Sequence, residues 1–147
     1  MELSHTQIGD ATEYRFFLYC IENNIAVSKP LTNNLPYDCI IEYKGKLLKI
    51  QIKTGYDCSS KDSFRFNCKS TSKNYNEVVV KTYEGKIDGF ITWYKEKPEN
   101  FYYIPIEKAN KSTMVIYYGE DPRKNQNYHL DFLLAPDAVS GSAIRSI

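Results

Sequence analysis

The stretch LPYDCIIEYKGKLLKIQIKT, residues 35–54, predicts a tight β-hairpin. It holds two runs of β-branched and aromatic residues, 37–44 and 47–53, separated by a turn signal. Gly45-Lys46 fits a two-residue type II′ loop, because glycine readily adopts the positive φ that the first loop position requires. We therefore expect the two runs to pair as antiparallel strands.

The predicted register separates an apolar face of the hairpin from a polar one. Asp38 faces Lys53 in this register, and Asp38, Gln51 and Lys53 share the polar face. Directly opposite side chains have Cβ atoms about 5 Å apart, which lets these three groups reach a common point. A three-residue loop would pair Asp38 with Ile52 and bury charge beside core residues, so this alternative is disfavoured.

The composition is that of an ordinary globular protein. The 147 residues carry a net charge of +1, with 42% hydrophobic and 25% charged residues, and this length buries a substantial core. We expect one domain over residues 1–134 and a weakly ordered tail over 135–147. Because the net charge is close to zero, any nucleic-acid surface must come from local clusters of basic residues.

The sequence carries no sign of export, membrane insertion or a zinc site. The first five residues, MELSH, are polar, and no apolar run approaches membrane-spanning length. We therefore expect a cytoplasmic protein without a membrane partner. The four cysteines form no CxxC pair and the two histidines are isolated, which favours reduced structural thiols over a zinc site.

Hydrophobic periodicity places one helix before a series of strands. Residues 6–23 have helical spacing, with Tyr14, Phe17, Leu18 and Ile21 as the expected buried stripe. Further strands are expected at 25–29, 63–69, 78–81, 87–94, 101–106 and 113–118. A helix followed mostly by strands indicates an α/β or α+β fold with a mixed sheet.

The polar face of the hairpin fits phosphodiester hydrolysis. This reaction needs a metal to polarise the phosphate and a cation to offset developing negative charge. Mg²⁺ prefers oxygen ligands, which Asp38, Gln51 and the backbone carbonyl of Ile52 can supply. Lys53 is the candidate cation, because its ammonium can neutralise the transition state or position water.

A second carboxylate is expected from the helix. Glu13 lies at the shoulder of the predicted stripe, one residue from Tyr14, so it can point inward over the sheet. Asp10 is the competing candidate, because it lies one helical turn earlier.

The motif Pro36-Tyr37-Asp38 followed by Gln51-Ile52-Lys53 resembles the PD-(D/E)xK nuclease signature. Gln51 stands in the (D/E) place, and Tyr37 separates the proline from the aspartate. The ordered set of further segments resembles the group I intron-encoded homing endonucleases of PD-(D/E)xK type known from cyanobacteria. This likeness extends over roughly residues 5–134 and rests on segments 9–13, 37–38, 51–55, 65–67, 70–72 and 83–88.

The resemblance implies an α/β fold with a restriction-endonuclease-like core, a mixed β-sheet flanked by helices. It also implies Mg²⁺-dependent double-strand cleavage of DNA at a long, near-palindromic site. By position, the catalytic residues would be Glu13, Asp38, Gln51 and Lys53, with Asp38, Gln51 and Ile52 holding the metal. Gln51 departs from the superfamily pattern and leaves the site one negative charge short.

The segment 61–86 is the expected DNA-binding region. It has six basic residues against three acidic ones, interleaved with Asn, Ser and Thr, and its part 70–77 predicts a loop or an extended arm. Basic side chains neutralise phosphates, small polar ones read base edges, and a two-stranded ribbon fits the major groove. The candidate contact residues are Arg65, Asn67, Lys69, Ser70, Thr71, Ser72, Lys73, Asn74, Tyr75 and Lys81, with a second patch at Arg123 and Lys124.

A double-strand break requires more than one copy of a chain with one active site. We expect at least a homodimer, and the resemblance also allows a tetramer. The apolar strands 87–94 and 101–106 are candidates for subunit contacts or for the core. Alternative readings are another PD-(D/E)xK nuclease (a restriction enzyme or Holliday junction resolvase), a non-catalytic DNA-binding module on a decayed nuclease fold, and a structural or interaction protein.

Overall fold

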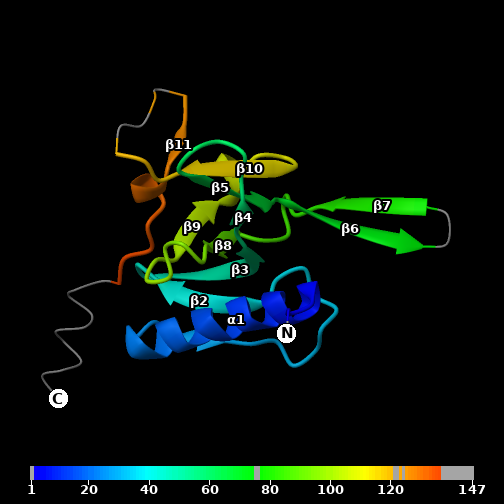
Figure 1. Ribbon diagram of the computed structural model, residues 1–147. Coiled ribbons are helices and arrows are strands. Elements are labelled where there is room, and N and C mark those ends of the chain that lie inside the picture. The colour runs from blue at the N-terminus through cyan, green and yellow to red at the C-terminus, as the bar shows by residue number, and fades with distance from the viewer. Residues whose placement is uncertain (1, 75–76, 121–122, 124, 137–147) are drawn as a thin grey trace, which may run out of the picture.

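The centre of the protein is a five-stranded mixed β-sheet (Figure 1). The computed structural model describes residues 2–74, 77–120, 123 and 125–136, and between 71 and 81 only the backbone of the strands. The sheet order is β1 (Val27–Ser28), β2 (Cys39–Tyr43), β3 (Lys46–Thr54), β8 (Gly89–Trp93) and β9 (Tyr102–Pro105). The pair β3 and β8 is parallel and the other pairs are antiparallel, so the predicted mixed sheet is confirmed.

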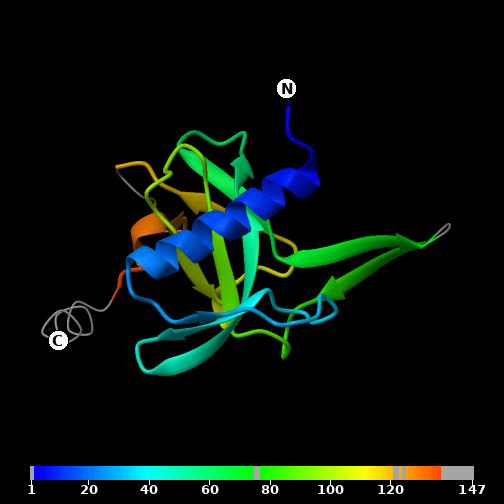
Figure 2. The ribbon, with the colours of Figure 1, turned by 90° about the horizontal axis from the view of Figure 1, so that it is seen from below.

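Helix α1 (His5–Glu22) covers one face of this sheet, and a second sheet covers part of the other (Figures 1 and 2). The second sheet has the order β11 (Asn127–Tyr128), β10 (Thr113–Tyr117), β5 (Ser63–Asn67) and β4 (Tyr56–Asp57). Two short 3₁₀ turns, Ile106–Lys108 and His129–Asp131, follow β9 and β11. The predicted α/β class holds, with one α-helix rather than several over the part of the chain that the structure describes.

Two apolar clusters fill the spaces between these layers. Between α1 and the central sheet lie buried Phe16, Cys20, Ile41, Ile50 and Ile91. Between the two sheets lie Phe64, Phe66, Phe90, Tyr102, Ile104, Met114 and Ile116. Every residue of β8 is buried, because this strand has core on both of its faces.

Helix α1 begins and ends within one residue of the prediction, but its buried face is different. Ser4 and Gln7 form a capping box at its start, which satisfies two free backbone donors. The buried side chains are Thr12, Phe16 and Cys20. The predicted stripe is therefore wrong: Tyr14, Leu18 and Ile21 are exposed, and Phe17 is partly buried.

The hairpin forms, but its loop lies one residue earlier than predicted. Tyr43 pairs with Lys46, so the loop is Lys44-Gly45. Both loop residues have positive φ, 51° and 78°, as in a type I′ turn rather than the predicted type II′ turn. Each partner shifts by two positions, and because side chains alternate with a period of two, the apolar and polar faces are unchanged.

A two-stranded arm stands apart from both sheets (Figures 1 and 2). Strands β6 (Lys69–Asn74) and β7 (Glu77–Thr82) pair along their full length, from Lys69 with Thr82 at the base to Asn74 with Glu77. The prediction of an extended arm for residues 70–77 is therefore confirmed for the described positions.

The strands predicted at 87–94 and 101–106 belong to the core. Phe90, Ile91, Tyr102 and Ile104 are fully buried within one protomer. The interpretation that these strands supply subunit contacts is therefore wrong.

The cysteines are free thiols, as the sequence predicts. Cys20, Cys39 and Cys68 are buried and Cys58 is half-buried. Over the residues that the structure describes, no helix is long and apolar enough to span a membrane.

Gly89 provides a test of the packing between β8 and β9. A Cβ at this position would lie 2.5 Å from Cε1 of Tyr103 and 2.7 Å from the Ile104 carbonyl oxygen. We expect Gly89→Ala to lower the free energy of unfolding by about 2 kcal/mol or more, measured by urea denaturation. Gly9→Ala is the matched control, since no atom lies within 4 Å of its Cβ. Its helical position should make alanine stabilising by about 0.5–1 kcal/mol. Equal effects of the two substitutions would contradict this packing.

Candidate active site

Asp38 lies where strand β2 begins and the regular ladder with β3 ends. Its N–H donates to the Ile50 carbonyl at 2.8 Å, although Ile50 already pairs with Cys39, as at a β-bulge. Its carboxylate oxygen Oδ2 accepts the N–H of Ile52 at 2.7 Å. The predicted cross-strand pair of Asp38 with Lys53 is therefore wrong, and Asp38 binds the edge of β3 instead.

This contact identifies the direction of the Ile52 carbonyl. In a β-strand the N–H and C=O of one residue point to the same side, so the Ile52 carbonyl faces the open edge beside Asp38. The side chains of Gln51 and Lys53 alternate with Ile52 and project from the sheet face opposite α1. Three potential oxygen donors, from Asp38, Gln51 and Ile52, are thus grouped around the end of β2.

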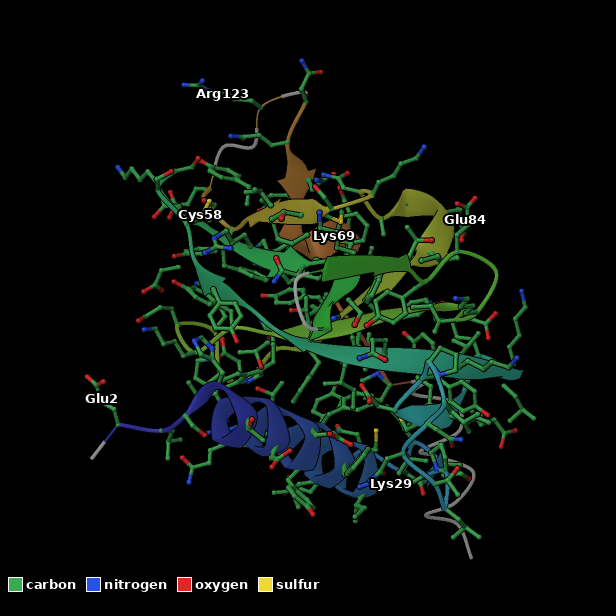
Figure 3. All side chains as sticks on the ribbon, turned by 90° about the vertical axis from the view of Figure 1, so that its right-hand side faces the viewer. Glu2, Lys29, Cys58, Lys69, Glu84 and Arg123 are labelled. Atoms are coloured by element: carbon green, nitrogen blue, oxygen red, sulfur yellow. The ribbon has the colours of Figure 1, made fainter. Side chains whose placement is uncertain are left out.

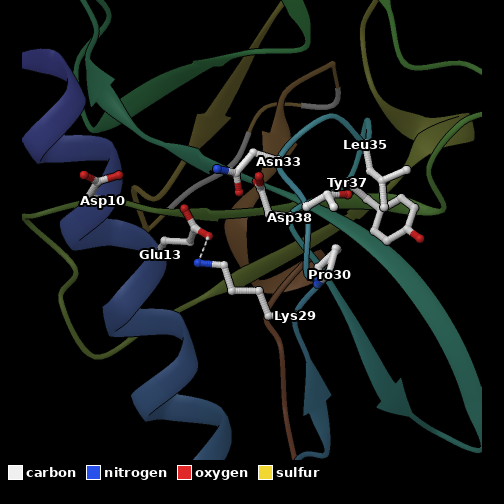
Figure 4. A pocket seen from close by; sticks show the side chains of 9 residues that line it. Asp10, Glu13, Lys29, Pro30, Asn33, Leu35, Tyr37 and Asp38 are labelled. Carbon is white, nitrogen blue, oxygen red and sulfur yellow. Dashed lines mark ion pairs between the residues drawn. The ribbon is translucent and has the colours of Figure 1, made fainter.

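The helix side of this edge carries Glu13 and Lys29 (Figure 4). The Glu13 side chain points from α1 toward Asp38, is 24% exposed and forms an ion pair with the Lys29 ammonium, with Nζ and Oε1 3.8 Å apart. Both line a pocket of about 320 Å³ together with Asp38 and Asp10. Asp10 is exposed on α1 and Glu13 is partly buried, so Glu13 is the better placed of the two to share a cation with Asp38.

Burial raises the pKa of both carboxyl groups. For Glu13 the main cause is desolvation, followed by the nearby negative charge of Asp38, while Lys29 opposes the shift. Desolvation also raises the pKa of Asp38, against the Ile52 hydrogen bond and the charges of Lys53 and Lys29. Two desolvated carboxylates that repel each other favour binding of a cation between them.

On the other face of the sheet, Lys53 and Gln51 lie beside the base of the arm. The Lys53 ammonium donates to the hydroxyl of Tyr83 at 3.3 Å. A pocket of about 630 Å³ connects the two regions, and it is lined by Asn33, Asn34, Leu35, Pro36, Asp38, Gln51, Ser70, Thr82, Tyr83 and Lys86. Asp38 lines this pocket and the one on the helix side, so it joins the two halves of the site.

The donor set fits a hard divalent cation. In the described part of the chain no three His, Cys, Asp or Glu side chains form a complete metal cage. The available ligands are all oxygens: the carboxylates of Glu13 and Asp38, the Gln51 amide and the Ile52 carbonyl. Mg²⁺ commonly binds one or two carboxylates and completes its shell with water and phosphate, so this incomplete set suits it.

A family model described as PD-(D/E)XK endonuclease matches residues 3–133. The chain belongs to the PD-(D/E)XK endonuclease family. Among solved structures, it is similar to the bacterial homing endonuclease I-Ssp6803I, with a TM-score of 0.73 and 20% identity. The match covers 98% of this chain and 95% of that one, and it supports the restriction-endonuclease-like fold. No curated protein sequence matches the chain.

As a PD-(D/E)XK endonuclease, the protein acts on DNA, and the predicted DNA contacts fall into separate places. Lys69 and Ser70 lie at the base of the arm, and Ser70 lines the larger pocket. Arg65 and Asn67 are exposed on β5, in the second sheet. Arg123 is exposed at the end of the molecule opposite Lys29 and away from Lys69 (Figure 3).

The remaining predicted contacts lie on or beyond the arm strands. Thr71, Ser72, Lys73, Asn74 and Lys81 belong to β6 and β7, whose backbone pairing alone is described. Tyr75 and Lys124 lie outside the described residues.

Several residues that line the two pockets were not among the predicted site residues, including Lys29, Asn33, Tyr83 and Lys86. Lys29 and Asn33 follow the short strand β1, and Tyr83 and Lys86 follow the arm. Tyr83 and Lys86 fall in segment 83–88, which contributes to the family resemblance, but the sequence gives them no individual role. For Lys29 the sequence offers only the weak signal of a basic residue directly before Pro30.

Asp38→Asn separates the stability of the site from its chemistry. Folding raises the Asp38 pKa above 3.8, so the folded protein binds this proton more tightly than the unfolded chain. The Asp38 contribution to the free energy of unfolding is therefore present below pH 3.8 and is lost as the pH rises from 3.8 through the higher pKa of the folded state. Asparagine removes the charge and its amide oxygen can still accept the Ile52 N–H. We expect an unchanged or higher melting temperature at pH 7, and cleavage reduced by at least about 100-fold.

Thermal unfolding at pH 7 and a DNA cleavage assay measure the two effects. A clear fall in melting temperature would show that the carboxylate stabilises the fold and would contradict its assignment as a strained, functional group.

Proposed function

We propose that the protein is a sequence-specific DNA endonuclease of homing type that makes Mg²⁺-dependent double-strand breaks at a long, near-palindromic site. The observation that carries the proposal is that two desolvated carboxylates, Glu13 and Asp38, line one pocket beside the edge of β3. Lys53 belongs to the same strand. Such an edge can hold a divalent cation and a phosphate together.

The residues divide the work of hydrolysis. Asp38, Gln51, the Ile52 carbonyl and Glu13 would hold the metal, which supplies polarisation of the scissile phosphate and activation of water. Lys53 offsets the negative charge that develops on the phosphate oxygens, where a positioned cation is most effective. The neutral Gln51 amide lowers the charge of the site, so we expect weaker metal binding than an all-carboxylate site gives.

The arm and the solved relative support the homing type over other nucleases. A two-stranded ribbon has the right width for the DNA major groove, and β6–β7 starts directly beside the larger pocket. A solved structure that matches this chain over nearly the full length of both proteins is that of a bacterial homing endonuclease. The arm would therefore read base edges several base pairs from the phosphate that is cut.

Digestion of a plasmid that carries the intact, intron-free insertion site tests the function directly. We expect linear product with Mg²⁺, none after chelation with EDTA, and loss of at least about 1,000-fold in rate for Lys53→Ala with DNA affinity retained. Lys46→Ala is the matched control, because Lys46 is exposed at the far end of the same strand.

Two outcomes would replace the proposal. Faster cleavage of four-way junctions than of linear duplex would identify a resolvase. Tight DNA binding without any Mg²⁺-dependent nicking would identify a DNA-binding module that has lost catalysis.

The exposed stripe of α1 supports self-association. Tyr14, Leu18 and Ile21 are 67%, 56% and 71% exposed, and they follow the helical spacing of a buried face. An apolar stripe of this kind on a soluble protein marks an interaction surface. Two copies of the chain are required to cut both DNA strands, so we assign this stripe to contact with a second copy.

Leu18→Glu tests this assignment. A charge at the centre of the stripe should weaken self-association by about 10-fold or more, because it cannot be buried without a partner. Multi-angle light scattering across a dilution series measures the effect. Leu130→Glu is the control, since Leu130 is 53% exposed on the turn after β11. Masses equal to the parent for Leu18→Glu at every concentration would exclude α1 as the contact.

A further inference from the structure

The Lys53 ammonium is held by a single aromatic side chain, Tyr83. Its Nζ donates to the Tyr83 hydroxyl at 3.3 Å and lies 5.0 Å from the centre of the Tyr83 ring. Neither of the two ion pairs among the described residues includes Lys53. Tyr83 therefore supplies both a hydrogen-bond acceptor and a cation–π contact to the Lys53 ammonium.

Tyr83 is itself fixed in place. It is only 8% exposed and packs edge-on against Phe90 of β8, with ring centres 5.5 Å apart. Its carbonyl accepts the N–H groups of Lys86 at 2.9 Å and Ile87 at 3.3 Å, which closes a turn directly after it. A side chain anchored at both its ring and its backbone can orient a flexible partner.

The position of Tyr83 in the chain links the arm to the site. It directly follows Thr82, which pairs with Lys69 as the last pair at the base of the arm. Thr82, Tyr83 and Ser70 line the same pocket as Asp38 and Gln51. Of the two chain connections between the arm and the body of the protein, the one that leaves β7 therefore runs directly through Tyr83.

Lysine needs such an anchor to act at a defined point. Its four-carbon stem loses about 2 kcal/mol of rotamer entropy when it is fixed, and an ammonium misplaced by about 1 Å contributes little to transition-state stabilisation. A carboxylate partner would fix Lys53 but also cancel its charge. A tyrosine hydroxyl fixes it and leaves the positive charge available to phosphate.

We propose that Tyr83 is a positioning residue that holds the Lys53 ammonium toward the scissile phosphate and ties its orientation to the base of the arm. The inference rests on the proposed function, since it assigns Tyr83 a role through Lys53. Tyr83 does not touch the reacting atoms, and its effect should appear in the rate of the cleavage step and not in DNA binding.

Two substitutions at Tyr83 separate its two contacts. Tyr83→Phe removes the hydroxyl and keeps the ring, and we expect the single-turnover cleavage rate at saturating DNA to fall about 10-fold. Tyr83→Leu removes both contacts, and we expect a fall of about 100-fold. DNA affinity measured with Ca²⁺ in place of Mg²⁺ should stay within about twofold for both.

A double-mutant cycle with Lys53→Ala distinguishes positioning from a structural effect. If Tyr83 acts through Lys53, adding Tyr83→Phe to Lys53→Ala should leave the residual nicking of supercoiled plasmid unchanged. Tyr118→Phe is the matched control, because the Lys97 ammonium lies 5.2 Å from the Tyr118 ring and neither residue lines either pocket. It should cut at the parental rate.

An NMR readout tests the contact without cleavage. The Lys53 ε-methylene protons should carry a ring-current shift that Tyr83→Phe retains and Tyr83→Leu removes.

The outcomes are distinct. A parent protein that never cuts, or a Lys53→Ala protein that cuts at the parental rate, overturns the proposed function and this role with it. If the parent cuts DNA, three results overturn the positioning role alone. One is that Tyr83→Phe cuts as fast as the parent, and another is that it loses DNA affinity in proportion to its loss of rate. The third result is that Tyr83→Phe slows the Lys53→Ala protein as strongly as it slows the parent. A missing ring-current shift overturns the contact itself.

Discussion

The hydrogen bond from the Ile52 N–H to the Asp38 carboxylate organises the whole site. At 2.7 Å it gives a buried strand-edge donor a charged acceptor, where the regular ladder would have placed a backbone carbonyl. Because β2 begins only at Cys39, the edge of β3 beside Ile52 stays open. Groups from the two faces of the sheet can meet only at such an open edge, which is why Glu13 and Lys53 both influence Asp38 or are influenced by it.

The same bond keeps a destabilising charge in place. Desolvation raises the pKa of Asp38 and Glu13, so the fold is less stable with both carboxylates ionised than with a proton or a cation bound. The Lys29 ammonium at 3.8 Å from Glu13 offsets part of this repulsion. Since half of the Lys29 side chain is exposed, its attraction is screened by solvent and it remains easy to displace by a more strongly bound cation.

Much of the fold and the catalytic strand could be predicted from the sequence because they depend on local pattern. The apolar and polar faces of the hairpin were predicted correctly although the loop lies at Lys44-Gly45, because a shift of two residues leaves each side chain on the same face of its strand. The stripe of α1 was wrong because the helix has apolar side chains on opposite faces, and periodicity alone cannot say which of them meets the sheet. The roles of Lys29 and Tyr83 could not be predicted, because both reach the site through contacts between segments distant in the sequence.

In the proposed function, the position of the arm allows a short chain to combine recognition with cleavage. The arm starts at Lys69 and ends at Thr82, and the next residue, Tyr83, contacts Lys53. Recognition and chemistry therefore share one pocket wall, without an intervening domain or long linker. The connection between β7 and the core is stiff, because Tyr83 packs in the core beside Phe90. An arm bound to DNA in the wrong geometry would therefore have to distort this connection or leave the groove. A nuclease that works as proposed would gain specificity at the cutting step as well as at binding, since only a correctly seated arm would leave the Lys53 ammonium beside the phosphate.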